Sequence, residues 1–412
     1  MNDEAPFAWP REGLTRVPYR LYHDPEIHRL EQERIWRGPT WSYVALEAEI
    51  PAPGDFKSTS IGDTPVVVTR NQDGTIHAWV NRCAHRGAIV CRALRGNAPT
   101  HTCVYHQWAY DPTGKLVGVP FRRGLGGKGG YPSDFKIEEH GLRTLRVESL
   151  SGMVFATFAA GGQPLERFLG EVMCGNIRRL MSRPLCILGT TRQYIYSNWK
   201  LYAENTRDSY HAVLLHLFYP TFGIARPAQK TTVRMDERRF HNLFTLYKPS
   251  GRESISVYGE KGVRAVEGQF QLADPALLRF VDERNDEKAI TIQALFPSVV
   301  VQQILNTLAT RQLVPRSEKE FELVWTYFGY EDDDTEMAEH RLRQCNMIGP
   351  AGYIAMEDAE ATEIVQRGTV RDWESSAIVE MAGSGFEDLD YGGQDENAIR
   401  GFWKGYRELM GL

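Results

Sequence analysis

Two pairs of cysteine and histidine stand out in the first third of the sequence. Cys83 and His85 are one residue apart, Cys103 and His106 are two apart, and 17 residues (86–102) separate the pairs. Thiolate and imidazole together select zinc or an iron–sulfur centre. Each pair lies inside a run of β-type sequence, so we expect two facing loops that each supply one cysteine and one histidine.

The one-residue spacing of Cys83 and His85 favours iron–sulfur over zinc. Structural zinc pairs usually stand two to four residues apart. In a Rieske [2Fe–2S] centre, two cysteines hold one iron and two histidines hold the other, which suits two loops with one ligand of each kind. A zinc-stabilised binding module is the alternative. We assign His77, His101 and Cys91, which lie outside the pattern, to the surface or the core.

A second group of chemistry-bearing residues lies in the stretch 198–217. Glu204, Asp208 and His211 are spaced i, i+4 and i+7, which would place them on one face of a helix. His216 follows His211 by five residues, or about 140° further around an ideal helix. Both imidazoles therefore reach one metal only if a π-bulge or a break lies between them.

The two groups together resemble one known family. The strings CAHRG (83–87) and CVYHQW (103–108) resemble the cluster loops of Rieske-type ring-hydroxylating oxygenases. The run N-x-x-D-x-x-H-x-x-x-x-H over residues 205–216 resembles that family's mononuclear iron motif, in which two histidines and one carboxylate hold Fe(II) and leave positions open for O2. The resemblance extends from GLTRVPY (13–19) to RGFWKGYRELMG (400–411).

This resemblance implies a set of ligands for the mononuclear iron. It makes His211 and His216 two of the three ligands. It places the third in the segment 349–359, where Asp358 is the preferred ligand and Glu357 the competing one.

The resemblance also implies catalytic roles for Asn205 and Asp208. In the family, the aspartate that matches Asp208 links the iron site to a cluster histidine of a neighbouring subunit. We therefore expect Asp208 to contact both His211 and the His106 of another copy. A solitary chain would then be inactive.

The texture of the sequence predicts an α+β protein. We expect a helical arm over residues 1–39 that packs on the catalytic domain, a small antiparallel β Rieske domain over 40–158, and a larger α+β catalytic domain of the helix-grip kind over 159–412. The Gly-dense run 124–130 is expected to be a surface loop. The expected helices are Pro25–Arg37, Leu165–Met181, Asn198–Leu217, Asp334–Asn346 and Glu396–Met410, and the clearest strands are Ala289–Phe296, Val299–Ile304 and Glu322–Tyr330.

Composition excludes several classes of protein. The 48 Lys and Arg residues against 53 Asp and Glu give a net charge of −5, which argues against nucleic acid as a partner. No apolar run approaches the roughly 18–20 residues of a membrane span, and the first 20 residues lack the apolar core of a signal peptide. Six cysteines in 412 residues are too few for a disulfide scaffold. We expect a cytoplasmic protein without a membrane or nucleic-acid partner.

Among family members, the sequence most resembles large subunits that act on aromatic carboxylates. The strings EIPAPGD (49–55) and MEDAEATEIVQRGTVRD (356–372) are most similar to the anthranilate 1,2-dioxygenase type, which implies conversion of anthranilate to catechol with release of CO2 and NH3. Salicylate 5-hydroxylase and terephthalate 1,2-dioxygenase are the alternatives. A carboxylate in an apolar pocket needs a fixed cation, so we expect Arg311, and with less support Arg400, to bind it.

The resemblance further implies protein partners. The chain has no dinucleotide or flavin fingerprint, so electrons from NADH would arrive through a separate reductase and a ferredoxin. A small oxygenase (beta) subunit and an α3β3 hexamer are expected. The alternative from another class is a Rieske electron-transfer protein without oxygenase activity.

Overall fold

The computed structural model describes residues 7–226, 229–249, 270–390 and 393–412. The chain divides into two compact units. Unit 1 comprises Met1–Ile35 and Glu166–Leu412, and unit 2 comprises Trp36–Leu165. The predicted boundaries at 39/40 and 158/159 remain a prediction.

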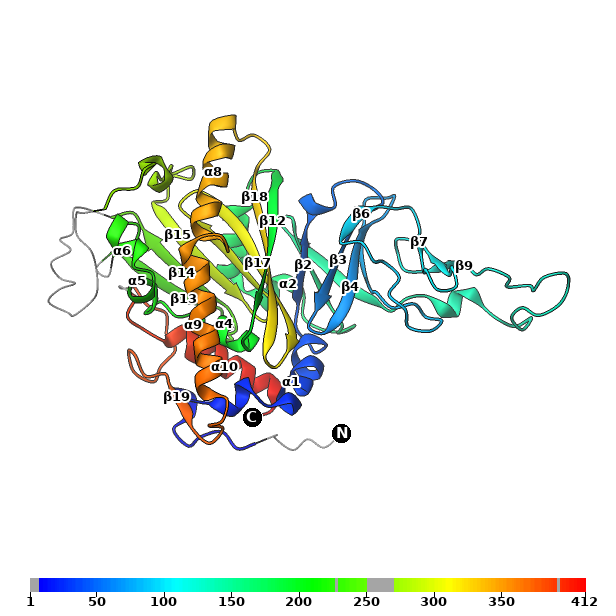
Figure 1. Ribbon diagram of the computed structural model, residues 1–412, viewed down its shortest axis with the longest axis horizontal. Coiled ribbons are helices and arrows are strands. Elements are labelled where there is room, and N and C mark those ends of the chain that lie inside the picture. Colours follow the sequence, from blue (N-terminus) through cyan, green and yellow to red (C-terminus); the bar gives the residue numbers. More distant parts are fainter. Residues whose placement is uncertain (1–6, 227–228, 250–269, 391–392) are drawn as a thin grey trace. The chain divides into compact units, whose positions relative to one another are not determined.

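Unit 2 is an antiparallel β structure built from two sheets (Figure 1). Its larger sheet has the strand order β2-β11-β10-β5-β4-β3-β6, and the smaller has the order β7-β8-β9. The strands are short because turns interrupt them often, as at Gly62, whose φ of 57° lets β3 reverse into β4. The bounds are β2 (Ser42–Leu46), β3 (Asp55–Ile61), β4 (Thr64–Arg70), β5 (Ile76–Val80), β6 (Arg95–Asn97), β7 (His101–Thr102), β8 (Ala109–Tyr110), β9 (Leu116–Gly118), β10 (Thr144–Leu150) and β11 (Met153–Thr157).

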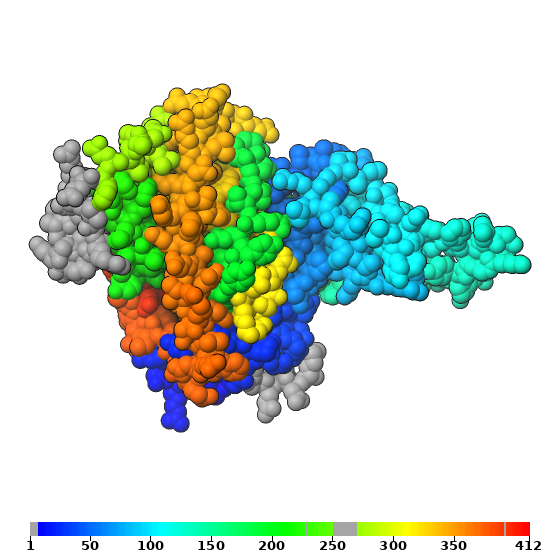
Figure 2. All heavy atoms as spheres, viewed as in Figure 1, coloured from blue at the N-terminus to red at the C-terminus, as the bar shows by residue number. Residues whose placement is uncertain are grey.

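The Gly-dense run of unit 2 is a surface loop, as predicted. Figure 2 shows the segment around residues 120–134 projecting from the rest of the unit. Phe121 and Leu125 are exposed there at 70% and 74%. Gly124 and Gly130 allow the close backbone approach at the base of the loop, since a Cβ at either would lie within 2.6 Å of a backbone atom.

Unit 1 is built on a seven-stranded antiparallel sheet of order β12-β18-β17-β16-β15-β14-β13. The strand β18 is buried over all but its first residue, which fits a sheet covered on both faces. A separate two-stranded ribbon pairs β1 with β19. The bounds are β1 (Arg16–Pro18), β12 (Leu185–Ile195), β13 (Thr231–Met235), β14 (Asn242–Tyr247), β15 (Lys288–Leu295), β16 (Val299–Ile304), β17 (Thr307–Ser317), β18 (Glu320–Tyr330) and β19 (Ser376–Ile378).

Helices cover this sheet, with α8 and α9 running along its front face in Figure 1. The α+β class is confirmed. Asp334 caps α8 by accepting a hydrogen bond from the Met337 N–H. The bounds are α1 (Pro25–Glu31), α2 (Leu165–Leu169), α3 (Glu171–Leu180), α4 (Trp199–Asn205), α5 (Ala212–Leu215), α6 (Phe218–Phe222), α8 (Thr335–Ile348), α9 (Tyr353–Thr369) and α10 (Asn397–Met410).

The predicted single helix over 198–217 is wrong. The helix α4 ends at Asn205, and α5 and α6 follow as two short pieces. The cause is Asp208, whose Oδ1 accepts hydrogen bonds from the Tyr210 and His211 N–H groups and so offers the backbone a turn in place of the helix. Glu204, Asp208 and His211 therefore do not share one helical face.

Within unit 1, a fully buried ion pair ties the N-terminal arm to α4. Glu31 Oε1 lies 2.6 Å from Lys200 Nζ, and both side chains are 0% exposed. Trp199 Nε1 and the Tyr406 hydroxyl also donate to the Glu31 carboxylate, at 2.8 and 2.6 Å. A buried charge that keeps these partners is tolerated, whereas one left alone is costly.

A Lys200→Met variant should therefore lose about 3–5 kcal/mol of unfolding free energy, because Glu31 keeps its charge without a counterion. Urea unfolding followed by fluorescence would measure this. Adding Glu31→Gln, which removes the orphaned charge but keeps an acceptor for Trp199 and Tyr406, should recover most of the loss. An unchanged midpoint in the single variant would contradict the role of the ion pair.

No helix among the described residues is both long enough and apolar enough to span a bilayer.

Candidate metal centres

The two predicted cluster loops of unit 2 have matching backbone geometry. Cys83 N–H donates to the Ala88 carbonyl, and the Gly87 N–H donates back to the Cys83 carbonyl. In the second loop, Cys103 N–H donates to the carbonyl five residues on, and the N–H four residues on returns to the Cys103 carbonyl. Gly87 and Gln107, which occupy the same place in the two loops, both have positive φ, at 73° and 57°. Both cysteines are thus held in the same kind of tight turn.

The side chains of these loops fit an iron–sulfur cluster. The rings of His85 and His106 have centroids 4.5 Å apart, and His85 stacks on Trp108 at 5.0 Å. His85 Nδ1 is buried without a hydrogen-bond partner among the described residues, as a nitrogen reserved for a metal would be. Cys83 and Cys103 are 4% and 1% exposed.

Tyr110 completes the surroundings of the first cysteine. The Tyr110 oxygen lies 3.2 Å from Cys83 Sγ. Burial, followed by the bond to Cys83, raises the pKa of Tyr110, so its hydroxyl keeps its proton and can donate to a thiolate. Hydrogen bonds to the sulfurs are one of the means by which a protein tunes a cluster's potential.

In unit 1, three predicted ligands converge. One donor atom from each of His211, His216 and Asp358 lies within 4.8 Å of the other two. Asp358 Oδ1 is 3.4 Å from His211 Nε2 and 3.1 Å from His216 Nε2. Two imidazoles and one carboxylate at a common point are the donor set of the mononuclear iron sites that activate O2. The residues present therefore fit such an ion.

The local fold explains how the three side chains meet. His211 and His216 flank the four-residue α5 as its N-cap and C-cap. The break that their five-residue spacing requires is therefore present. Asp358 lies on the buried face of α9, where it is 4% exposed. The other buried residues of α9 recur at helical spacing and are Ile354, Ala355, Ala359, Thr362, Gln366 and Thr369.

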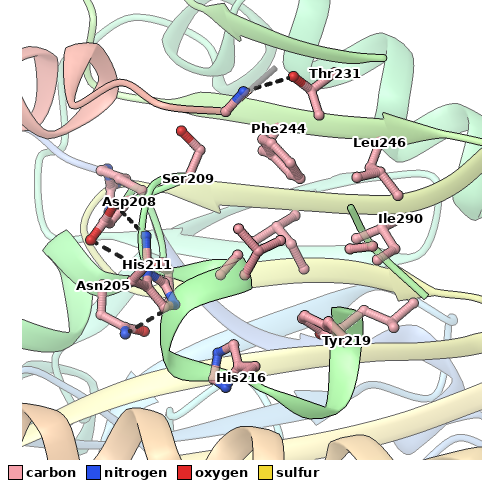
Figure 3. A pocket seen from close by; sticks show the side chains of 18 of the residues that line it. Asn205, Asp208, Ser209, His211, His216, Tyr219, Thr231, Phe244, Leu246 and Ile290 are labelled. Atoms are coloured by element: carbon pink, nitrogen blue, oxygen red, sulfur yellow. Dashed lines mark hydrogen bonds and ion pairs between the residues drawn. The ribbon is translucent and has the colours of Figure 1, made fainter. Parts of the chain in front are cut away.

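Two further carboxylates hold the outer nitrogens of the histidines. Asp208 Oδ2 is 3.4 Å from His211 Nδ1, and His216 Nδ1 is 2.8 Å from Glu357 Oε2. Each ring is thereby turned so that its Nε2 faces Asp358, and Figure 3 shows Asp208 beside His211. Carboxylates in this position fix the tautomer and orientation of ligating histidines. Glu357 and Asp358, which competed for the ligand role in the sequence, contact opposite edges of His216.

Electrostatics in this group favour charge on every member. Burial alone would lower the pKa of His211, but the Asp208 and Asp358 carboxylates, 3.4 Å from its Nδ1 and Nε2, outweigh it and raise the pKa to about 10. Burial would raise the pKa of Asp358, yet the two histidines hold it well below its usual range. The site formed by His211, His216 and Asp358 is therefore stabilised by positive charge, which either a bound metal ion or protons on the histidines can supply.

Asn205, the first residue of the motif over 205–216, lies beside His211 and Asp358. Its Nδ2 donates to Asp358 Oδ1 at 3.0 Å. It also lies 3.5 Å from His211 Nε2 (Figure 3). The side chain therefore reaches the same point as the three candidate ligands from the end of α4.

A pocket opens beside these residues. Its polar end holds Asn205, Asp208 and His211, and its other wall is apolar, as Figure 3 shows. Such a wall suits the faces of an aromatic ring. The apolar lining includes Val233, Phe244, Leu246, Ile290, Ile292 and Ile304.

Arg311 lines this pocket from β17, and it is 5% exposed. Its Nε donates to Gln302 Oε1 at 2.5 Å and its Nη1 to the Tyr202 hydroxyl at 3.0 Å. Its guanidinium also lies over the Trp325 ring, 4.5 Å from the centroid. Its two hydrogen bonds hold the guanidinium in place, and none of the ion pairs among the described residues involves Arg311.

Arg400 lies elsewhere and does not line the pocket. Its Nε donates to the Gly385 carbonyl at 2.6 Å, and its Nη1 donates to the carbonyls of Val379 and Met381 at 3.0 and 3.1 Å. A third nitrogen binds Asn397 Oδ1. These bonds give Arg400 a structural role in the chain before α10, so we propose only Arg311 as a carboxylate partner.

Gln302 and Tyr202, which orient Arg311, were not singled out from the sequence. Pairing of the predicted strand Val299–Ile304 with the strand that carries Arg311 would have indicated that Gln302 lies near Arg311. In the observed register Gln302 lies opposite Ala309 and Val300 opposite Arg311, so Gln302 and Arg311 share a face as diagonal neighbours. No sequence pattern relates Tyr202 to Arg311, because Tyr202 lies in α4, 109 residues away in the sequence.

Comparisons with known proteins agree with both centres. Residues 40–129 match the Rieske [2Fe-2S] domain, and residues 187–412 match the ring hydroxylating alpha subunit (catalytic domain). The chain is 50% identical over 411 residues to the anthranilate 1,2-dioxygenase large subunit of Burkholderia cepacia, covering 100% of this chain and 97% of that one.

Two other relatives also match along nearly their whole length. Terephthalate 1,2-dioxygenase, terminal oxygenase component subunit alpha 2, of Comamonas sp is 43% identical, with 99% of this chain and 98% of that one covered. The salicylate 5-hydroxylase large oxygenase component of Ralstonia sp is 42% identical, with 98% and 96% covered.

The fold agrees with solved structures. Naphthalene 1,2-dioxygenase from Rhodococcus sp. superimposes with a TM-score of 0.79 at 24% identity, over 96% of this chain and 94% of that one. The chain carries a Rieske [2Fe–2S] domain and a catalytic domain whose family implies a mononuclear iron. It belongs to the Rieske-type ring-hydroxylating oxygenases, as an alpha (large) subunit.

Proposed function

We propose that this chain is the large oxygenase subunit of a multicomponent dioxygenase that converts anthranilate to catechol, with release of CO2 and NH3. The observation that carries the proposal is the convergence of His211, His216 and Asp358 beside an apolar pocket that holds the unpaired charge of Arg311. The choice of anthranilate is supported by 50% identity to an anthranilate dioxygenase, against 43% and 42% for the terephthalate and salicylate enzymes.

Different residues around the pocket bind the substrate carboxylate, the aromatic ring and the iron. Arg311, held by Gln302 and Tyr202, pairs with the substrate carboxylate, and the apolar wall packs against the ring. His211, His216 and Asp358 hold the iron, which when bound supplies a site for O2 next to the ring. Asn205 and Asp208 keep Asp358 and His211 in place. Because these groups are fixed by packing, little reorganisation is needed when the substrate enters.

We also propose the partners and the division of labour between segments. Residues 40–158 take electrons from a ferredoxin served by an NADH-dependent reductase, and residues 159–412 with the arm 1–39 form the oxygenase. The name alpha subunit implies an assembly, and we propose an α3β3 hexamer with a small beta subunit in the cytoplasm, where NADH is available.

The substrate assignment is tested by supplying reductase, ferredoxin and NADH and by comparing O2 uptake and products with anthranilate, salicylate, terephthalate and benzoate. Catechol together with released ammonia from anthranilate alone is the expected result. Preferred turnover of salicylate or terephthalate would replace the substrate but keep the class of reaction. Reduction of the cluster without O2 uptake on any of them would indicate an electron-transfer protein instead.

Arg311 provides a sharper test of carboxylate binding. An Arg311→Gln variant should lose about 100-fold in kcat/KM for anthranilate, because the substrate carboxylate is left buried without its counterion. Its kcat/KM for the uncharged anthranilamide should not fall. Arg316→Gln, in the same strand but 40% exposed and paired with Glu322, is the matched control and should behave as the unmodified protein. Equal losses for both substrates would contradict the proposed contact.

A further inference from the structure

The turn that carries Asp208 is anchored from another part of the chain. Residues 206–210 lie between α4 and α5, outside any helix. Among the described residues, Asp208 Oδ1 accepts hydrogen bonds from the N–H groups of Tyr210 and His211, close to it in sequence. The neighbouring Ser209 hydroxyl instead donates to Asp395 Oδ2 at 2.9 Å and lies 3.3 Å from the Asp395 carbonyl oxygen. Ser209 therefore joins the turn to the segment just before α10.

Asp395 is a fully buried carboxyl group with few hydrogen-bond donors around it. Its side chain is 0% exposed, and its pKa is raised by burial and, to a lesser extent, by the charge of Asp208. Besides Ser209, its carboxylate accepts only a long bond of 3.4 Å from the Asn397 N–H among the described residues. Burying a carboxyl group with so few donors costs free energy that the fold must offset elsewhere.

The segment that carries Asp395 is itself well fixed. Gly393 N–H donates to Thr231 Oγ1 at 3.1 Å, and a Cβ at Gly393 would stand 3.6 Å from the Ser209 Cβ, in ordinary contact. On its other side, Asn397 is bound by Arg400, which also holds three backbone carbonyls. A rigid path thus runs from the start of α10 through Asp395 and Ser209 to the turn of Asp208.

We propose that Asp395 is a positioning residue for this reaction: through Ser209 it holds the turn 206–210 so that the Asp208 carboxylate faces His211 Nδ1. The proposal rests on the proposed function and on the link to a cluster histidine of another copy that the family resemblance implies for Asp208. It explains why a buried acid stands here, because two acceptor oxygens on one carboxylate let Asp395 bind Ser209 and its own helix start together. A loosened turn would let Asp208 leave His211, which interrupts transfer without removing an iron ligand.

Two variants test the contact, Ser209→Ala and Asp395→Ala, together with the double variant. Hydrogen exchange of the backbone amides in a peptide covering 206–211 should be at least about 10-fold faster in each single variant, and no faster in the double variant. In single turnover of the pre-reduced enzyme, the rate of cluster oxidation should fall by at least about 10-fold, with anthranilate affinity and iron content unchanged. Asp395→Asn, which keeps an acceptor for Ser209, should restore most of the rate.

The control is Asp390→Ala, which removes an acid whose side chain is 77% exposed and should change neither measurement. Additive effects of the two single variants, or amide exchange and transfer at unmodified rates in Ser209→Ala, would overturn the proposal. Should Asp395→Ala fail to fold, Ser209→Ala alone decides the matter, since it deletes only one hydroxyl. Amide exchange does not depend on turnover, so a protein that does not oxidise anthranilate would refute the proposed function while leaving this test intact.

Discussion

An Asp358→Ala variant is expected to lose the mononuclear iron and to lose turnover on the order of 10³-fold or more, while its Rieske cluster stays intact. Asp358 Oδ1 is the atom that both imidazole Nε2 atoms approach, at 3.4 and 3.1 Å, so its removal takes away the common point of the site. The cluster ligands belong to unit 2 and are untouched. Visible and EPR spectra of the reduced cluster, iron content and product yield would measure the three outcomes.

Glu357→Ala is the matched control for this prediction. Glu357 is adjacent in sequence and also carboxylic, but it contacts His216 Nδ1 and not Nε2. Loss of such an orienting carboxylate typically lowers metal affinity about 10- to 100-fold. Iron should therefore remain bound in Glu357→Ala at excess Fe(II) and be lost on dilution. If Glu357→Ala abolished iron binding while Asp358→Ala retained iron, the two residues would have exchanged roles.

Replacing Asp208 by alanine is expected to give a different failure. With excess Fe(II), as for Glu357→Ala, both iron centres should stay loaded and the cluster should still accept electrons, but turnover should fall on the order of 10²-fold or more because the path to His211 is cut. Asp208 is suited to this path since its side chain is 23% exposed while its Oδ2 lies 3.4 Å from His211 Nδ1. Stopped-flow oxidation of the reduced cluster would show the slow step. Unchanged transfer would contradict the role.

A complementation experiment tests whether transfer runs between copies. Cys83→Ser should lack the cluster and Asp358→Ala the iron, so neither should be active alone. Co-expressed with the beta subunit in one hexamer, they should recover part of the activity, because an intact cluster of one copy then meets an intact iron site of another. Transfer within one chain predicts no recovery. Adding Asp208→Ala to the Cys83→Ser chain should abolish the recovered activity.

Several features of the fold follow from local sequence. The strand Val299–Ile304 has the predicted bounds, because a short apolar run between turn residues leaves little freedom of length. The helix α8 starts where Asp334 predicts it, since a cap acts on the next three residues. The convergence of His211, His216 and Asp358 could be anticipated only through the family motif, because 141 residues (217–357) separate His216 from Asp358.

The remainder depends on contacts that sequence spacing does not reveal. The stretch 198–217 has helical periodicity, yet the Asp208 side chain competes for the backbone N–H groups and ends the helix. Arg400 is as basic as Arg311, and only the positions of distant carbonyls decide that one is structural and the other faces a pocket. The bond between Ser209 and Asp395 joins residues 186 apart and has no sequence pattern.

One chain is expected to hold both a [2Fe–2S] cluster and a separate mononuclear iron. Iron and acid-labile sulfide analysis of the purified, reconstituted protein measures both centres at once. About three irons and about two sulfides per chain are expected. About two irons with two sulfides would leave a cluster without an oxygenase site, and zinc in place of iron and sulfide would contradict the assignment of both centres.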